Sequence, residues 1–299
     1  MVALPQPGGP FFLTDSGLET DLVFHHGVDL PAFAAFPMLE TPQEQLLADY
    51  VAAHGAVASE HGLPIIIETP TWRANADWGA QLGYDAKALD RVNRRAVALG
   101  RQSAPEALVS GCLGPRGDGY VVGEAMAADQ AMAYHRPQIR SLAEGGAHLV
   151  SALTLSYADE AVGIALAARE VGVPAVISFT VEVDGRLPDG TGLEAAVRAV
   201  DAATDGSPAY YMVNCAHPEH VAAAGATWGQ RLLGLRANAS RMSHAELDES
   251  EVLDDGDPAE LAAQLVGSGA TVLGGCCGTD LRHIQALAGA LRDGGSPKV

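Results

Sequence analysis

The sequence is poor in several kinds of residue, and each shortage excludes a class of protein. Only 4 of its 299 residues are cysteines, too few for a disulfide framework in a chain of this size. No run of about 18 apolar residues occurs, so we expect no membrane-spanning helix. The N-terminus has no basic region followed by an apolar stretch, as a secretory signal would have. We therefore expect a cytoplasmic protein with reduced thiols.

Basic residues are also scarce. The chain has 18 lysines and arginines against 37 acidic residues, which gives a formal net charge of −19. Such a surface repels the phosphates of nucleic acids and the headgroups of anionic lipids. We therefore expect small molecules as partners, with no nucleic acid and no membrane, and the oligomeric state is left open.

Hydrophobic residues make up 48% of the chain, and they form short runs that recur along it. Ile65-Ile66-Ile67 is continuous rather than alternating, which is typical of parallel strands buried on both faces. The predicted strands are Phe11–Asp15, Pro64–Glu68, Ala107–Cys112, Ala147–Leu153, Pro174–Thr180, Ala209–Cys215, Leu232–Ala237 and Thr271–Gly275.

Amphipathic, alanine-rich segments separate these strands and predict helices. Examples are Pro42–His61, Asp129–Glu144, Asp159–Val171, Pro218–Ala224, Pro258–Gly267 and Asp280–Leu291. Eight strand-and-helix units in this length predict a TIM (β/α)8 barrel of the α/β class. We expect a single domain, 1–299, with a core from about 11 to 292. A doubly wound sheet is the alternative, but no Gly-x-Gly-x-x-Gly follows the first strand.

Polar residues gather where the predicted strands end. They are Asp15, Glu68, Cys112, Thr154, Thr180, Cys215, Asn238 and Cys276. Because the carboxyl ends of the strands meet at the catalytic face of a TIM barrel, we expect these residues to converge there.

The strongest local motif is Gly274-Gly275-Cys276-Cys277-Gly278-Thr279, at the end of the eighth predicted strand. Two adjacent cysteines between glycines offer two thiolates on a backbone that can bend around an ion. Catalytic Zn²⁺ takes three protein ligands and keeps one open position, and Cys215 is the natural third ligand. The alternative is ordinary buried cysteines, which is the interpretation we prefer for Cys112.

A zinc ion with three thiolate ligands suits one kind of chemistry. It binds a further thiol, lowers the pKa of that thiol and holds it as a thiolate for attack on carbon. Zinc that generates hydroxide more often has histidine ligands. The cysteines therefore favour alkylation of a thiol over hydrolysis.

Together these segments resemble the homocysteine S-methyltransferase family, which includes betaine–homocysteine and S-methylmethionine-dependent enzymes. The resemblance runs from Thr14 to Ile284. Asp15-Ser16-Gly17-Leu18-Glu19-Thr20 is similar to the family's opening turn, and Ser178-Phe179-Thr180 to its fifth-strand segment. Asn214-Cys215 and the Cys276-Cys277 motif are similar to its zinc-ligand segments. The family fold is a TIM barrel, as the strand pattern also predicts.

The resemblance implies roles for individual residues. Cys215, Cys276 and Cys277 would be the zinc ligands and the catalytic residues. Asp15 matches an aspartate beside the amino-acid substrate, where a carboxylate can pair with an α-ammonium group. Glu19, Thr180 and Asn238 are weaker substrate-binding candidates. Glu19 also suits a first helical turn, and Asn238 could equally brace the backbone.

The chain departs from the family at its fourth strand. The family has Phe-Glu-Thr there, and its glutamate grips the amino group of homocysteine, whereas this chain has Leu153-Thr154. Either another acid compensates or the acceptor is not homocysteine. Glu68 and Glu182 are the available acids, and Glu68 is favoured because it ends a strand directly.

The second strand departs as well. Where the family often has Thr-Asn-Thr-Tyr, this chain has Glu68-Thr69-Pro70-Thr71-Trp72. Trp72 could attract a sulfonium or quaternary ammonium donor by a cation–π interaction, or it could be a loop tryptophan packed on the barrel rim.

These observations predict a zinc-dependent S-methyltransferase. Its partners would be a thiol acceptor, most simply homocysteine giving methionine in methionine biosynthesis, and a small onium donor. Donor candidates are S-methylmethionine, S-adenosylmethionine and betaine, since no cobalamin or folate module is visible. The alternatives are a methyltransferase or demethylase with another thiol or onium substrate, a zinc-dependent lyase or hydrolase, and a non-catalytic barrel that binds zinc or a small molecule.

Overall fold

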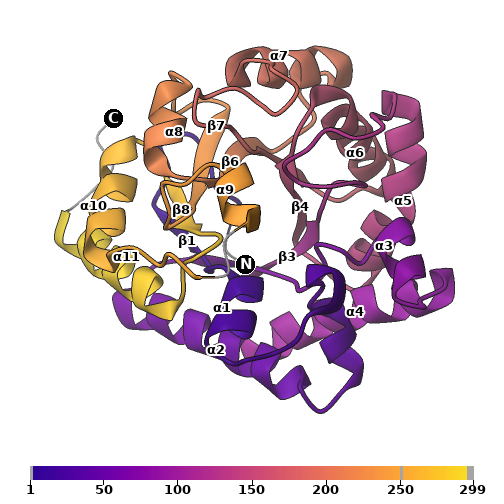
Figure 1. Cartoon of the computed structure of the whole chain (residues 1–299), viewed down its shortest axis with the longest axis horizontal. Coiled ribbons are helices and arrows are strands. Elements are labelled where there is room, and N and C mark those ends of the chain that lie inside the picture. The colour runs from indigo at the N-terminus through magenta and orange to yellow at the C-terminus, as the bar shows by residue number, and fades with distance from the viewer. Residues whose placement is uncertain (1–2, 250–251, 295–299) are drawn as a thin grey trace.

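Eight parallel strands, each hydrogen-bonded to the next along the chain, close into a barrel in the computed structural model (Figure 1). The structure describes residues 3–249 and 252–294, so the outermost residues of the predicted domain lie outside it. The strands are β1 (Phe12–Thr14), β2 (Ile65–Glu68), β3 (Leu108–Leu113), β4 (Leu149–Leu155), β5 (Ala175–Phe179), β6 (Tyr210–Ala216), β7 (Leu232–Ala237) and β8 (Val272–Gly275). Each predicted strand coincides with one of these to within two residues at either end.

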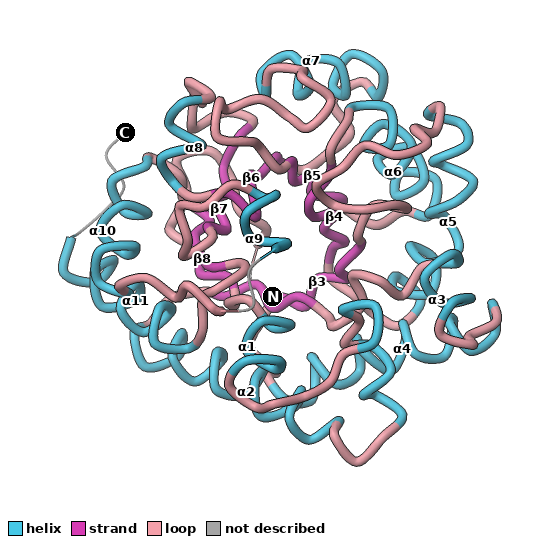
Figure 2. The backbone as a smooth tube through the Cα atoms, in the orientation of Figure 1, coloured by secondary structure: helices cyan, strands magenta, loops and turns pink. Residues whose placement is uncertain are grey.

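Helices follow the strands and surround them, as the backbone trace in Figure 2 shows. They are α1 (Leu18–Phe24), α2 (Glu44–His61), α3 (Ala76–Gln81), α4 (Ala86–Ser103), α5 (Ala128–Glu144), α6 (Ala158–Val171), α7 (Leu193–Thr204), α8 (Pro218–Ala223), α9 (His244–Glu249), α10 (Pro258–Ser268) and α11 (Leu281–Gly294), with short 3₁₀ helices η1 (Pro31–Phe33) and η2 (Phe36–Glu40). The predicted TIM barrel is therefore confirmed. In the described part of the chain, no helix combines the length and apolarity needed to cross a membrane.

The barrel closes because β1 pairs in parallel with both β2 and β8. In that closure Phe12 lies opposite Val272, and Leu13 lies opposite both Ile65 and Leu273. The first strand and the last therefore lie side by side, and this brings the turn after β1 beside the Cys276-Cys277 loop.

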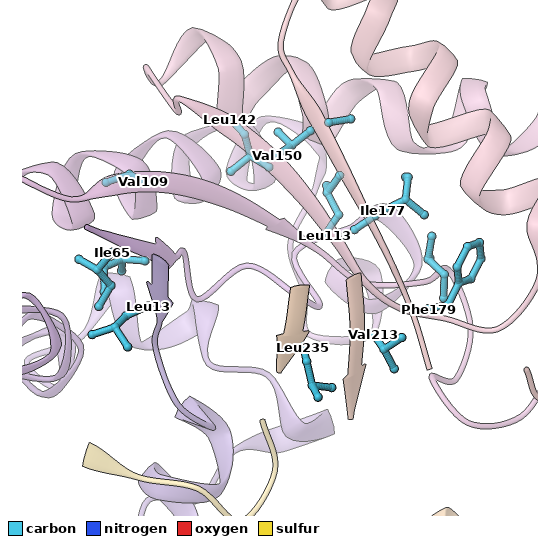
Figure 3. Packing of buried hydrophobic residues seen from close by; sticks show 14 of the residues in the cluster. Leu13, Ile65, Val109, Leu113, Leu142, Val150, Ile177, Phe179, Val213 and Leu235 are labelled. Carbon is cyan, nitrogen blue, oxygen red and sulfur yellow. The ribbon is translucent and has the colours of Figure 1, made fainter. Parts of the chain in front are cut away.

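The strands divide their apolar side chains between two cores. In β2, Ile65 and Ile67 point outward into the layer between sheet and helices, and Ile66 points into the barrel. Figure 3 shows the outer layer, where Val150 lies close to Leu142 of α5. The inner core is formed by Phe12, Ile66, Leu108, Leu149, Val176, Tyr210, Met212, Leu233 and Val272. All of these lie near the starts of their strands, so the amino end of the barrel is packed solid.

Further along the strands the interior becomes polar. Side chains alternate across a strand, so the residue two places after an inner-core residue also faces inward. In β2, β3, β4 and β5 these residues are Glu68, Ser110, Ser151 and Ser178, and all four are buried. The apolar core therefore ends midway along the barrel, and polar side chains form the floor of the space above it.

Candidate active site

The three predicted zinc ligands lie together at the carboxyl end of the barrel. Cys215 comes from β6, while Cys276 and Cys277 follow β8. Their sulfur atoms all lie within 4.8 Å of one another, and Cys215 Sγ is 3.4 Å from Cys277 Sγ. Cys112 is buried and belongs to neither group of potential metal ligands found among the described residues, in agreement with its interpretation as an ordinary cysteine.

The backbone at Cys215 is held in an uncommon conformation. Its φ is 56°, in the left-handed region that side chains rarely adopt. Its carbonyl oxygen accepts a hydrogen bond from His244 Nε2 at 2.7 Å and a longer one, 3.3 Å, from Thr180 Oγ1. Such strain persists only where neighbouring groups hold it, and here it turns the thiol toward Cys277.

The loop that carries Cys276 and Cys277 packs tightly against the turn after β1. A Cβ atom added to Gly17 would lie 2.3 Å from the carbonyl oxygen of Cys276, so only glycine fits there. The Gly17 amide also donates to Thr279 Oγ1 at 3.1 Å. Gly278 has a φ of 79°, which lets the chain turn after the two cysteines. These contacts fix the two thiols relative to α1.

The electrostatic surroundings favour a thiolate at Cys276. Hydrogen bonds from the thiols of Cys215 and Cys277 lower the pKa of Cys276 well below its ordinary value. The same contacts raise the pKa of Cys277. Asn214 Nδ2 lies 3.9 Å from Cys276 Sγ, and the Asn214 side chain also bonds Thr154 and Ser178. Of these two thiols, Cys276 is therefore the one that ionises more readily.

The thiols open into a cavity of about 420 Å³. Of the predicted substrate-binding residues, Asp15, Glu19, Glu68 and Trp72 line this cavity together with the three cysteines. Thr180, Glu182 and Asn238 are absent from its lining. Thr180 is fully buried behind Cys215, Glu182 pairs with His244 at 2.9 Å, and the backbone amide of Asn238 bonds the Ala216 carbonyl.

A buried charge cluster forms the base of the cavity. Arg236 of β7 lies 2.6 Å from Asp15 Oδ1, but its distance to Glu68 Oε1 is 3.9 Å. Burial alone would lower the pKa of Arg236, and the carboxylates of Asp15 and Glu68 instead raise it. The arginine therefore remains charged, and it neutralises Asp15 more closely than Glu68.

Glu68 has a carboxylate oxygen that is free to bind a substrate. Its side chain is 7% exposed, and its Oε2 atom has no hydrogen-bond partner among the described residues. Burial raises the pKa of Glu68 to about 7, although Arg236 opposes the change. Burial likewise raises the pKa of Glu19, on the first turn of α1, to about 7. Both acids are poised to ionise when a cation enters the cavity.

Trp72 and Leu153 form one wall of the cavity. The indole Nε1 of Trp72 donates to the Leu153 carbonyl at 3.3 Å, which fixes the ring on β4. The Arg73 guanidinium lies 4.6 Å from the Trp72 ring centroid, so the chain's own cation already contacts this ring. Leu153 is 6% exposed and places an apolar side chain on the lining.

Three residues that sequence reasoning missed complete the site. Tyr120, from the loop after β3, has its hydroxyl 3.0 Å from Cys215 Sγ and stacks on the His244 ring at 4.0 Å. His244 begins α9, which lies across the ring of strands in Figure 2. Arg236 could have been found from the sequence, since it is a charged residue inside a predicted buried strand. No sequence pattern pointed to Tyr120 or His244.

A second group of potential ligands, His25, Asp255 and Asp280, lies outside the cavity lining. Arg282 Nη2 pairs with Asp255 at 2.7 Å and with Asp280 at 2.6 Å. Arg282 therefore balances the charge of these carboxylates, and the cysteine cluster is the stronger candidate for a metal site.

Comparison with known proteins agrees with this geometry. The sequence model of the homocysteine S-methyltransferase family matches residues 12–291. Homocysteine S-methyltransferase 3 of Arabidopsis thaliana is 23% identical over 334 residues, covering 95% of this chain and 91% of that protein.

Solved structures share the fold. The homocysteine methyltransferase MmuM from Escherichia coli in its metallated form superposes with a TM-score of 0.75 at 23% identity, covering 94% of this chain and 96% of the other. The apo form of MmuM gives a TM-score of 0.68 at 23% identity, with the same coverage of both chains. The family match spans nearly the whole barrel, both cysteine segments included, and the chain therefore belongs to the homocysteine S-methyltransferase family.

Proposed function

We propose that the chain is a zinc-dependent S-methyltransferase that moves a methyl group from a small onium donor to the thiol of homocysteine, giving methionine. The observation that carries this proposal is the cluster of three cysteine sulfurs at the edge of a cavity whose base holds Asp15, Glu68 and Arg236. Homocysteine requires a group that activates its thiol and, beside it, charged side chains that bind its α-ammonium and carboxylate groups. The three cysteines and the charged residues at the base of the cavity have this arrangement.

The donor set fits Zn²⁺. Soft thiolate sulfurs are preferred zinc ligands, and three of them leave the fourth tetrahedral position free. Cys215, Cys276 and Cys277 would hold the ion, with Asn214 Nδ2 3.9 Å from one sulfur. Zinc bound there would stabilise the acceptor thiol as a thiolate.

The charged base would orient the amino-acid head of the acceptor. The unpartnered Oε2 of Glu68 can accept a hydrogen bond from an α-ammonium group. Asp15 is already paired with Arg236 at 2.6 Å, so its part is to hold the arginine and to brace β2 by accepting from the Glu68 amide at 3.1 Å. Holding head and sulfur together positions the sulfur for in-line attack.

A donor that carries positive charge suits the rest of the lining. Glu19 and Glu68 gain charge as a cation enters, because a nearby positive group lowers a raised carboxyl pKa. The net charge of −19 adds a field that attracts cations to the protein. S-methylmethionine, S-adenosylmethionine and betaine all meet this requirement.

Leu153 supports a second candidate within the same chemistry. The fourth-strand position that carries a glutamate in the family pattern is here an apolar side chain in the cavity wall. A thiol or onium substrate other than homocysteine would suit this wall if Glu68 does not bind an ammonium group.

The test combines zinc analysis of the purified protein with a donor-by-acceptor methylation screen followed by mass spectrometry. We expect stoichiometric zinc and formation of methionine from homocysteine with at least one onium donor. Methylation of another thiol in place of homocysteine would select the second candidate. Bound zinc without methylation of any thiol by any onium donor would refute both, and turnover without a thiol would indicate a lyase or hydrolase.

A further inference from the structure

Exposed apolar side chains gather at the mouth of the cavity. Phe24 is 42% exposed, Phe33 37% and Val252 76%, and all three line the cavity. In the described part of the chain, five large apolar side chains are exposed, and only Val121 and Val183 lie outside this lining. Apolar surface concentrated at the mouth of a site indicates that a ligand covers it.

The backbone that presents Phe33 is strained. Ala32 and Phe33 follow one another with φ values of 55° and 53°. A bulky residue rarely adopts this left-handed conformation, because its Cβ atom crowds the backbone. Strained residues persist where the rest of the fold holds them, and they concentrate at functional sites. The strain points to a role for the exposed ring independently of its place on the cavity wall.

The cavity has a buried, charged base and a mouth at which apolar rings lie beside the exposed carboxylates of Asp118 and Asp254. Asp15 is 2% exposed and Glu68 7%, while the rings of Phe24 and Phe33 reach solvent. In our proposed function the acceptor occupies the charged base beside the cysteines, so the donor must lie on the mouth side. In-line transfer places the leaving atom on the far side of the methyl group from the thiolate. The leaving group therefore extends toward the two rings.

We propose that the methyl donor is a sulfonium whose leaving group carries an apolar alkyl or aryl arm, and that Phe24 and Phe33 bind this arm. This inference rests on the proposed function. The acceptor thiolate forms a bond to the methyl carbon, the donor's sulfur–methyl bond breaks, and its electron pair stays on the donor sulfur, which leaves as a neutral thioether. The cation is attracted by Asp118 and Asp254, which also line the cavity, and the arm is bound by the rings.

The test is a series of donors that differ only in their arm. Trimethylsulfonium, dimethylpropylsulfonium and dimethylhexylsulfonium are compared with homocysteine as the common acceptor. Burial of one methylene group stabilises binding by about 0.8 kcal/mol, which corresponds to about fourfold. We therefore expect kcat/KM to rise by about fourfold for each methylene added, until the arm passes beyond the rings.

Variants test whether the two rings cause the increase of kcat/KM with arm length, which is called the slope below. We expect Phe24→Ser and Phe33→Ser each to reduce the dependence of kcat/KM on arm length. Val183→Ser is the matched control, because Val183 is 52% exposed but does not line the cavity, and it should keep the wild-type slope. Phe33→Gly removes the same ring but relieves the backbone, since glycine adopts a φ of 53° without strain, and a denaturant titration shows whether each variant is folded.

The outcomes separate this inference from the function on which it rests. Wild-type protein that uses trimethylsulfonium but shows no gain with longer arms overturns the apolar donor and leaves the methyltransferase intact. If kcat/KM still rises with arm length in both Phe24→Ser and Phe33→Gly, the inference is also overturned, because the arm is then bound by other parts of the cavity. If betaine methylates homocysteine but no sulfonium does, the inference fails and the proposed function stands. If no onium donor, betaine included, methylates any thiol, the proposed function itself fails.

Discussion

Replacing Cys276 with serine is expected to remove most of the bound zinc and nearly all methyl transfer. A hydroxyl is a poor zinc ligand beside two thiolates, and Cys276 is the thiol whose pKa its neighbours lower most clearly. Loss of the ion removes several kcal/mol of thiol activation, so we expect kcat/KM to fall by about 10³-fold or more. Zinc content by atomic spectroscopy and methionine formation by mass spectrometry measure the two effects.

Cys112→Ser is the matched control for that experiment. Cys112 is buried and lines the same cavity, but it lies outside the group of three sulfurs. Burial raises the pKa of Cys112 well above its ordinary value, so this thiol stays protonated and a hydroxyl should replace it with little effect. Full zinc and full activity in Cys276→Ser, or equal losses in both variants, would contradict the assignment.

Glu68→Gln is expected to weaken acceptor binding and to stabilise the protein above neutral pH. The amide oxygen can still accept a hydrogen bond but carries no charge to pair with an ammonium group, and a charge-assisted hydrogen bond is worth about 1.5–3 kcal/mol. The KM for homocysteine should therefore rise roughly 10- to 150-fold, with a smaller change in kcat. Steady-state kinetics at saturating donor test this expectation.

The effect on stability follows from the raised pKa. Because Glu68 titrates near pH 7 in the folded protein and near 4.5 when unfolded, the folded state binds the extra proton between these values. Glu68 therefore lowers the free energy of unfolding of the wild type as the pH rises from 4.5 through 7, and its contribution to that fall is about 3 kcal/mol. Glu68→Gln lacks this loss, so denaturant titrations should show it more stable than wild type at pH 8 and similar at pH 4.5.

Glu182→Gln provides the comparison. Glu182 was the other acid considered as a replacement for the family glutamate, but it pairs with His244 outside the cavity lining. We expect its KM for homocysteine to stay near the wild-type value. A larger rise in KM for Glu182→Gln than for Glu68→Gln would show that the wrong acid has been assigned to the ammonium group.

The fold could be predicted because its pattern is local and repeated. Runs such as Ile65-Ile66-Ile67 are apolar on both faces, as buried parallel strands require, and their number determines the barrel. The meeting of the two cysteine segments could be predicted as well, since the carboxyl ends of the strands all lie at one face of the barrel.

Side-chain direction at a strand end was less predictable. Thr180 and Asn238 follow β5 and β7, so they were expected near a substrate. In the structure the Thr180 hydroxyl turns to the Cys215 carbonyl, and neither residue lines the cavity. A shift of one residue along a strand reverses the face on which a side chain lies, and sequence position alone does not settle which face that is.

Contacts made by long loops could not be predicted at all. Tyr120 lies 95 residues from Cys215 in the chain, yet its hydroxyl is 3.0 Å from that sulfur. The loop after β3 has no periodicity that would orient it, and its place depends on packing against His244. Arg236 was more accessible to reasoning, because an arginine in a buried strand needs a partner of opposite charge.

In the proposed function, three cysteines hold a zinc ion whose fourth position takes the acceptor thiol. X-ray absorption at the zinc edge, with the protein alone and with selenohomocysteine, tests it most directly. We expect three sulfur ligands in both samples and one additional selenium ligand when the selenol is present. Fewer than three sulfur ligands, or no zinc–selenium scattering at saturating selenohomocysteine, would contradict it.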